Sequence, residues 1–91
     1  MNQIAHNDFL KVDKELNKVY SELIKLLPEN EKQLLIKAQR DWIKFRDSHC
    51  LFEREQFKGG SIQPLIHSTC LAEATNNRIV NLKAAIKSRE N

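Results

Sequence analysis

The sequence predicts an all-α fold: one domain, residues 1–91, in which three helices form an antiparallel hairpin or bundle. The first observation behind this prediction is the composition, because two Gly, two Pro and 7% aromatic residues leave few turn formers and few strand formers. The second is that apolar residues recur at steps of three and four. The third is that Pro28 and Gly59-Gly60 interrupt this pattern and divide the chain into three segments.

The first segment predicts a long amphipathic helix with Lys and Glu on its outer side. Its apolar positions are Phe9, Val12, Leu16, Val19, Tyr20, Leu23, Ile24 and Leu27. Pro28 lacks an N–H and disfavours helical geometry in the residue before it, so the helix should end there. Asn30 is the expected N-cap of the next helix.

The second segment predicts another helix that ends at Gly59 and Gly60, where a left-handed residue is easily accepted. The apolar stripe expected on it consists of Leu34, Leu35, Ala38, Trp42, Phe45, His49 and Phe52.

Ser61 stands where the cap of a third helix belongs, and Pro64 is tolerated only in a first helical turn. The third helix should therefore begin near Ile62 or Gln63. Its inward positions are expected to be Leu65, Ile66, Thr69, Ala72, Ile79, Leu82, Ala85 and Ile86. Short connections favour an up-down-up topology and a monomer, with a dimer that shares the first helix as the alternative.

Charge and hydropathy exclude several classes of protein. The net charge is +3, but basic and acidic residues are interspersed throughout, so no patch suited to nucleic acid forms. No apolar run is long enough to span a bilayer. The first residues lack the features of a secretory signal peptide, which leaves a cytosolic protein or a mature exported domain whose signal has been removed.

The two cysteines define the most specific constellation in the chain. An antiparallel hairpin would place Cys50, near the end of the second helix, opposite Cys70, near the start of the third. This position suits a disulfide, with free thiols or a metal site including His49 and His67 as alternatives. The metal site is disfavoured because adjacent helical residues such as His49 and Cys50 point about 100° apart.

Helical steps away from the cysteines place Trp42 opposite Arg78 and bring Arg46 to the same seam. Arg78 can then stack on the indole, Asp47 or Asp41 can pair with an arginine, and Thr75 can add a hydrogen bond. We interpret this group as an architectural clamp. The alternative is an exposed Trp and Arg hot spot for a protein partner.

Enzyme signatures are not found: the sequence has no nucleophile elbow, no phosphate-binding glycine loop and no zinc-protease helix motif. We therefore expect no catalytic residue, no metal and no cofactor.

Residues 38–50, AQRDWIKFRDSHC, resemble the signature AQR-x-W-x-x-[YF]-RD-x-x-C of the LprI-type lysozyme-inhibitor domain, a family of small exported bacterial proteins. Three further motifs resemble the family in the same order along the chain: LN-x-x-Y from Leu16, GGS from Gly59, and C-x4-T-x2-R-x3-L from Cys70. The matching structural positions are Leu16, Asn17 and Tyr20, then Gln39, Arg40, Trp42, Arg46 and Asp47, then Gly60, and finally Thr75, Arg78 and Leu82 after Cys70.

This resemblance implies an all-helical, periplasmic or secreted protein with a Cys50–Cys70 disulfide that binds and blocks a lysozyme. The alternative is an envelope adaptor that binds another protein without affecting lysozyme; an exposed apolar stripe on the first helix would favour it. Animal lysozymes are basic, so an inhibitor of charge +3 would depend on local acids and on loops. The contact residues expected on this basis are Glu29, Glu31, Glu53, Gly59, Ser61 and Gln63.

Overall fold

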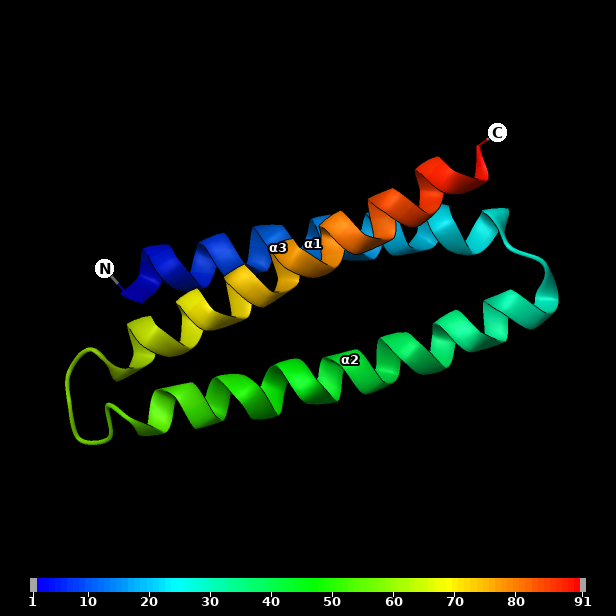
Figure 1. The fold of residues 1–91 in the computed structure, drawn as a ribbon. Helices are drawn as coiled ribbons and strands as arrows, with labels where there is room; N and C mark the ends of the chain where they lie inside the picture. The colour runs from blue at the N-terminus through cyan, green and yellow to red at the C-terminus, as the bar shows by residue number, and fades with distance from the viewer. Residues whose placement is uncertain (1, 91) are drawn as a thin grey trace.

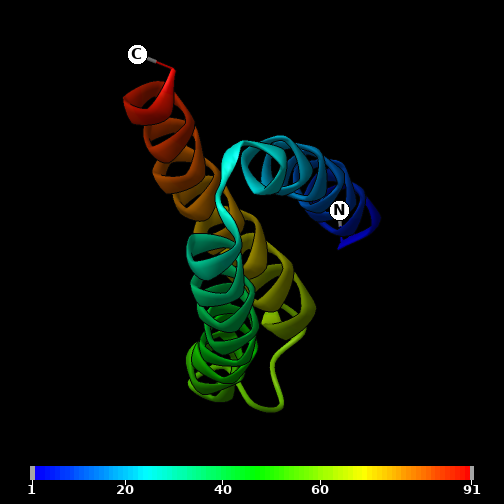
Figure 2. The same ribbon diagram turned by 90° about the vertical axis from the view of Figure 1, so that its right-hand side faces the viewer.

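The computed structural model describes residues 2–90 and contains three long helices: α1 (Asn2–Leu26), α2 (Glu29–Glu55) and α3 (Gln63–Arg89) (Figure 1). The helices run up, down and up, so α1 and α3 are parallel and α2 is antiparallel to both (Figure 1). The molecule is elongated, measuring 49 × 21 × 15 Å. Seen along its length, α1 lies to one side of the α2–α3 pair (Figure 2). The predicted three-helix, all-α fold is confirmed.

The hydrophobic core lies mainly between α1 and α3, which have the most extensive contact of any two helices. Leu16, Val19 and Leu23 follow one another at helical spacing on α1 and are almost completely buried. They pack with Ile79 and Leu82 of α3. All core residues of the first and third segments come from their predicted inward faces. The other predicted positions are half-buried outside this cluster (Phe9, Ile24, Leu65, Ile66 and Ala72) or exposed (Thr69).

The turn between α1 and α2 lies at Pro28, as predicted, but the predicted cap is wrong. Pro28 itself is the N-cap, with an extended backbone (φ −67°, ψ 163°), and helical geometry begins at Glu29. The Pro28 carbonyl already accepts the N–H of Lys32 at 2.9 Å, so the hydrogen-bond ladder starts before Asn30. Glu29 and Glu31 occupy the first turn, where carboxylates interact favourably with the helix dipole.

The turn between α2 and α3 also differs from the prediction in its details. α2 ends at Glu55 and not at Gly59, because the N–H groups of Phe57 and Lys58 bond three residues back, to Arg54 and Glu55, and tighten the chain. Gly59 does adopt a left-handed conformation, with φ +83°. Ile62 takes the N-cap position expected for Ser61, and no side chain caps α3. Pro64 lies in the first turn, as predicted.

A disulfide joins Cys50 of α2 to Cys70 of α3, with 5.6 Å between the Cα atoms. Cys50 is fully buried. Both sulfurs are used in this bond, so neither is available as a thiolate, and the free-thiol and metal alternatives are wrong for these cysteines. The cross-link holds the two helices together near the turn that connects them.

The apolar stripe predicted on the second helix is wrong in part. The residues of α2 that face the other helices are Leu35, Gln39, Trp42, Arg46 and Cys50. Leu34, Phe45 and Phe52 are instead 68%, 62% and 64% exposed. Phe45 stands five residues before Cys50, which places it about 140° away around the helix. Because Cys50 must face α3, Phe45 points outward.

We predict that replacing both cysteines, Cys50→Ala with Cys70→Ala, lowers the free energy of unfolding by about 3 kcal/mol, because the bond closes a loop of 20 residues and restricts the unfolded chain. Urea unfolding followed by circular dichroism measures the change. Ser48→Ala with Thr69→Ala, both exposed on the same helices, is the control and should shift stability by about 1 kcal/mol or less. An equal effect of the two double variants would contradict the prediction.

Candidate functional site

Arg46 connects all three helices through its guanidinium group. Its Nη1 donates to Thr75 Oγ1 on α3 at 3.3 Å and lies 3.4 Å from Asp13 Oδ1 on α1. Its Nε donates to Asp47 Oδ1 at 2.9 Å. The residue is only 8% exposed, and its charge is balanced by these two carboxylates. Such a satisfied buried charge fixes how the helices align.

Trp42 lies between two arginines. The guanidinium carbon of Arg46 is 5.2 Å from the centre of the indole, and that of Arg78 is 5.8 Å away. Arg78 Nε also donates to Gln39 Oε1 at 2.9 Å, which gives the buried Gln39 a partner. Burial lowers the pKa of Arg78, although an arginine stays charged at neutral pH. Both arginines thus make the cation–π geometry that the register allows.

Three contacts predicted for the architectural clamp are confirmed: Arg78 lies over Trp42, Arg46 pairs with Asp47, and Thr75 accepts a hydrogen bond from Arg46. Asp41 pairs instead with Lys37 at 2.6 Å, and this hydrogen bond lowers the pKa of Asp41. Sequence reasoning missed Asp13, and it placed Gln39 among the structural positions without its hydrogen bond to Arg78. Asp13 stands three residues before Leu16, and that spacing on the buried face of α1 could have identified it.

Most motif positions of the predicted family therefore have structural roles. Leu16 and Leu82 are core residues, Tyr20 packs against the core, and Gly60 belongs to the turn between α2 and α3. Asn17 and Arg40 are exposed.

We predict that Arg46→Met lowers the free energy of unfolding by about 2 kcal/mol, because the seam loses hydrogen bonds and cation–π contacts while Asp13 and Asp47 keep access to water. Thermal and urea unfolding measure the loss. The matched control is Arg40→Met, an exposed arginine on the same helix, which should change stability by about 0.5 kcal/mol at most. A loss no larger than that of the control would show that the clamp does not stabilise the fold.

The fold changes the titration of His67, which lies on α3 three residues before Cys70. Burial lowers its pKa below the ordinary value of 6.5, and Arg54 adds repulsion, while Asp47 opposes the shift. The unfolded chain therefore takes up the proton first as the pH falls. The stabilising contribution is complete above about pH 6.5 and is lost as the pH drops through the pKa of the folded state.

We predict that His67→Gln makes the free energy of unfolding less dependent on pH between about 7.5 and 5. Urea unfolding at several pH values in this range tests it. The control Ser21→Ala, at an exposed position of α1 with no side chain that titrates in this range, should leave the pH dependence of the wild type unchanged. The same slope in His67→Gln as in the wild type would contradict this assignment.

An exposed aromatic cluster lies on the outer side of α2. Phe45 and His49 stack with ring centres 5.5 Å apart, and Phe52 follows 6.2 Å from His49. We call these three residues the α2 aromatic face. It borders two adjoining hollows between α2 and α3, of about 260 and 290 Å³. Glu53 and Glu73 line these hollows, and Glu53 Oε1 is 3.5 Å from His49 Nε2.

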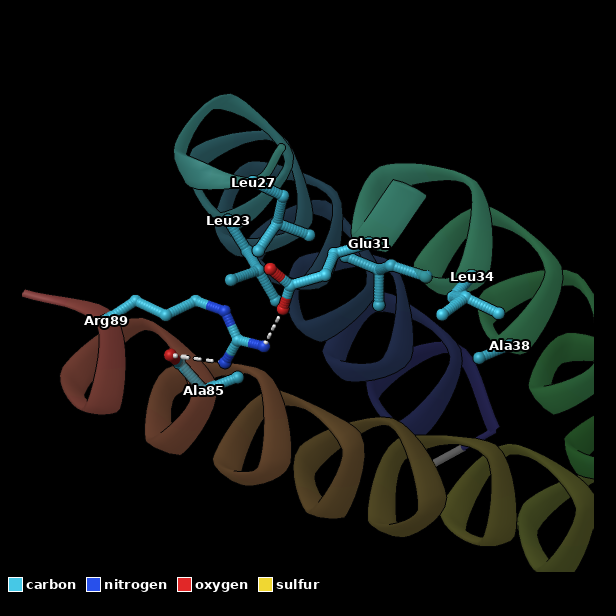
Figure 3. A pocket seen from close by; sticks show the side chains of 8 residues that line it. Leu23, Leu27, Glu31, Leu34, Ala38, Ala85 and Arg89 are labelled. Carbon is cyan, nitrogen blue, oxygen red and sulfur yellow. Dashed lines mark hydrogen bonds and ion pairs between the residues drawn. The ribbon is translucent and has the colours of Figure 1, made fainter. Parts of the chain in front are cut away.

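A third hollow, of about 270 Å³, lies at the other end of the molecule where α1 ends and α2 begins (Figure 3). Its lining is largely aliphatic: Leu23, Leu27, Leu34, Leu35, Ala38 and Ala85. Arg89 Nη2 pairs with Glu31 Oε1 at 2.7 Å beside these residues, as Figure 3 shows. This ion pair joins the end of α3 to the start of α2.

The six contact residues expected from the sequence lie at two separate places. Glu29 and Glu31 are in the first turn of α2, where Glu29 accepts a hydrogen bond from Gln33 at 2.9 Å. Glu53 lies near the other end of α2, and the turn that follows this helix contains Gly59 and Ser61 and leads to Gln63, whose Nε2 donates to the Arg54 carbonyl at 3.3 Å. From Glu31 to Glu53 the helix axis rises about 33 Å. The structure therefore does not join the two groups into one site, and their role in binding stays a prediction.

The fold and the exposed surface define a small, disulfide-linked helical protein. Its arginines Arg46 and Arg78 make contacts between helices, and its outer surface exposes apolar side chains. A family model described as lysozyme inhibitor LprI matches residues 1–82, and the chain belongs to this family. It is a family of inhibitors, not of enzymes.

One curated relative is the uncharacterized protein R02472 of Rhizobium meliloti (strain 1021), which is 36% identical over 104 aligned positions. The alignment covers all of this chain and 75% of the relative. No solved structure matches the chain.

Proposed function

We propose that this chain is an exported bacterial protein, periplasmic or secreted, that binds a lysozyme and blocks its action on the cell wall. The observation that carries the proposal is membership of the LprI family over residues 1–82. The Cys50–Cys70 disulfide supports export, because such bonds persist mainly in oxidising compartments. Among the helices of residues 2–90, none is long and apolar enough to cross a membrane.

The architecture suits an inhibitor that acts by occlusion. A protein that blocks a cleft binds best when its contact surface is already rigid, since less conformational entropy is then lost on binding. The disulfide and the Arg46 contacts fix α2 against α3, so residues displayed on this hairpin need little rearrangement.

An envelope adaptor that binds another protein without inhibiting lysozyme is the second candidate. The exposed apolar residues Leu34, Phe45 and Phe52 favour it, because exposed apolar surface commonly marks a protein contact. These residues are on α2, whereas the expected stripe was on the first helix, which exposes Ile4, Leu10 and Leu26. An inhibition assay separates the two candidates.

We predict that the oxidised protein inhibits lysozyme stoichiometrically when titrated into an assay of cell-wall hydrolysis at physiological salt. Animal and bacterial enzymes are both assayed. The variant Cys50→Ala with Cys70→Ala should inhibit less, because its hairpin is less rigid. Arg40→Met, at an exposed position on a different side of α2 from Phe45, should match the wild type. No inhibition of any lysozyme by an excess of correctly folded protein would favour the adaptor.

A further inference from the structure

We propose that the α2 aromatic face, together with Glu53 and Glu73, is the surface that docks onto a basic protein partner. This inference rests on the proposed function and deepens it, because it assigns the contact with a cationic lysozyme to one side of the α2–α3 hairpin.

The first argument is the unused apolar area. Phe45 and Phe52 are 62% and 64% exposed, although their helix is held firmly by Cys50 and Arg46. Phe45 stacks on His49, and Phe52 lies on the other side of His49 at a tilt, so the three rings form a continuous surface. Aromatic residues on a rigid element are effective binding anchors, because they bury a large area and lose little conformational freedom.

The second argument is charge. The charged residues that line the two hollows beside this face are Glu53 and Glu73, and both are acidic. Within residues 2–90, Glu73 makes no ion pair, so its carboxylate is free to meet a cation. Electrostatic effects between exposed groups decay within about 8 Å at physiological salt, so these nearby acids matter more to a bound partner than the net charge of +3.

The same charges argue against a second copy of this chain as the occupant. Two copies that met through this face around a twofold axis would bring the same carboxylates toward one another. These carboxylates attract a basic partner and repel the identical carboxylates of a second copy. The surface also includes Glu53 of the predicted contact residues and leaves Glu29 and Glu31, at the other end of α2, outside it.

The test measures binding of a basic animal lysozyme to variants of the full, oxidised chain by surface plasmon resonance. We expect Phe45→Ser with Phe52→Ser to weaken the affinity at least 30-fold, chiefly through faster dissociation. Glu53→Lys with Glu73→Lys should slow association about tenfold, with a larger effect at low salt. Because all four side chains lie at the surface or line open hollows, thermal unfolding should show that the variants remain folded.

The matched controls are Val80→Ser, an equally exposed apolar residue of α3, and Glu15→Lys, an exposed acid of α1; each should bind within twofold of the wild type. Wild-type binding by the folded phenylalanine variant would overturn this inference and leave the proposed function standing. Failure of the wild type to bind any lysozyme would overturn both. A wild-type dimer that the phenylalanine variant abolishes would assign the face to a second copy and also overturn the inference.

Discussion

The direction in which Cys50 faces decides which side of α2 is buried, and the rest of the molecule depends on that choice. The bond to Cys70 fixes the rotation of α2 about its own axis. Arg46 and Trp42 lie one and two turns before Cys50 on the same side and therefore also face α3. Phe45 and Phe52 lie on the other side of α2 and therefore point away from the core.

This orientation gives the protein two different kinds of helix contact. α1 and α3 are joined by an aliphatic core that includes Leu16, Leu23 and Leu82, and such a contact depends on buried area. α2 is joined to α3 by a disulfide and to both α1 and α3 by hydrogen bonds of Arg46, where geometry is more specific. Among the described residues, every buried side-chain polar atom has a hydrogen-bond partner, so this polar contact carries no desolvation penalty from orphaned groups.

The sequence was sufficient for the fold because its signals agreed with one another. Helical periodicity, Pro28 and the glycine pair defined three helices, and the cysteine spacing gave the alignment of α2 with α3 that placed Trp42 beside Arg78. The caps were wrong because helical geometry begins at Glu29 and Gln63. The N-cap residues are therefore Pro28 and Ile62, whose side chains have no hydrogen-bond acceptor. The buried side of α2 was wrong because two stripes overlap on it, and the more hydrophobic one, with Phe45 and Phe52, is the exposed one. The alignment from the cysteines already turned Trp42 and Arg46 inward, but apolar periodicity favoured the stripe with Phe45 and Phe52, and only the structure shows which of the two is buried.

The orientation of α2 is tested most directly by hydroxyl-radical footprinting of the free, oxidised monomer, with side-chain labelling read by mass spectrometry. The account predicts strong labelling of Phe45 and Phe52, weak labelling of Trp42 relative to its intrinsic reactivity, and almost none of Leu16 and Leu23. Protection of Phe45 and Phe52 in the monomer, with Trp42 and Leu35 labelled strongly instead, would contradict it, because α2 would then be rotated and its aromatic face buried.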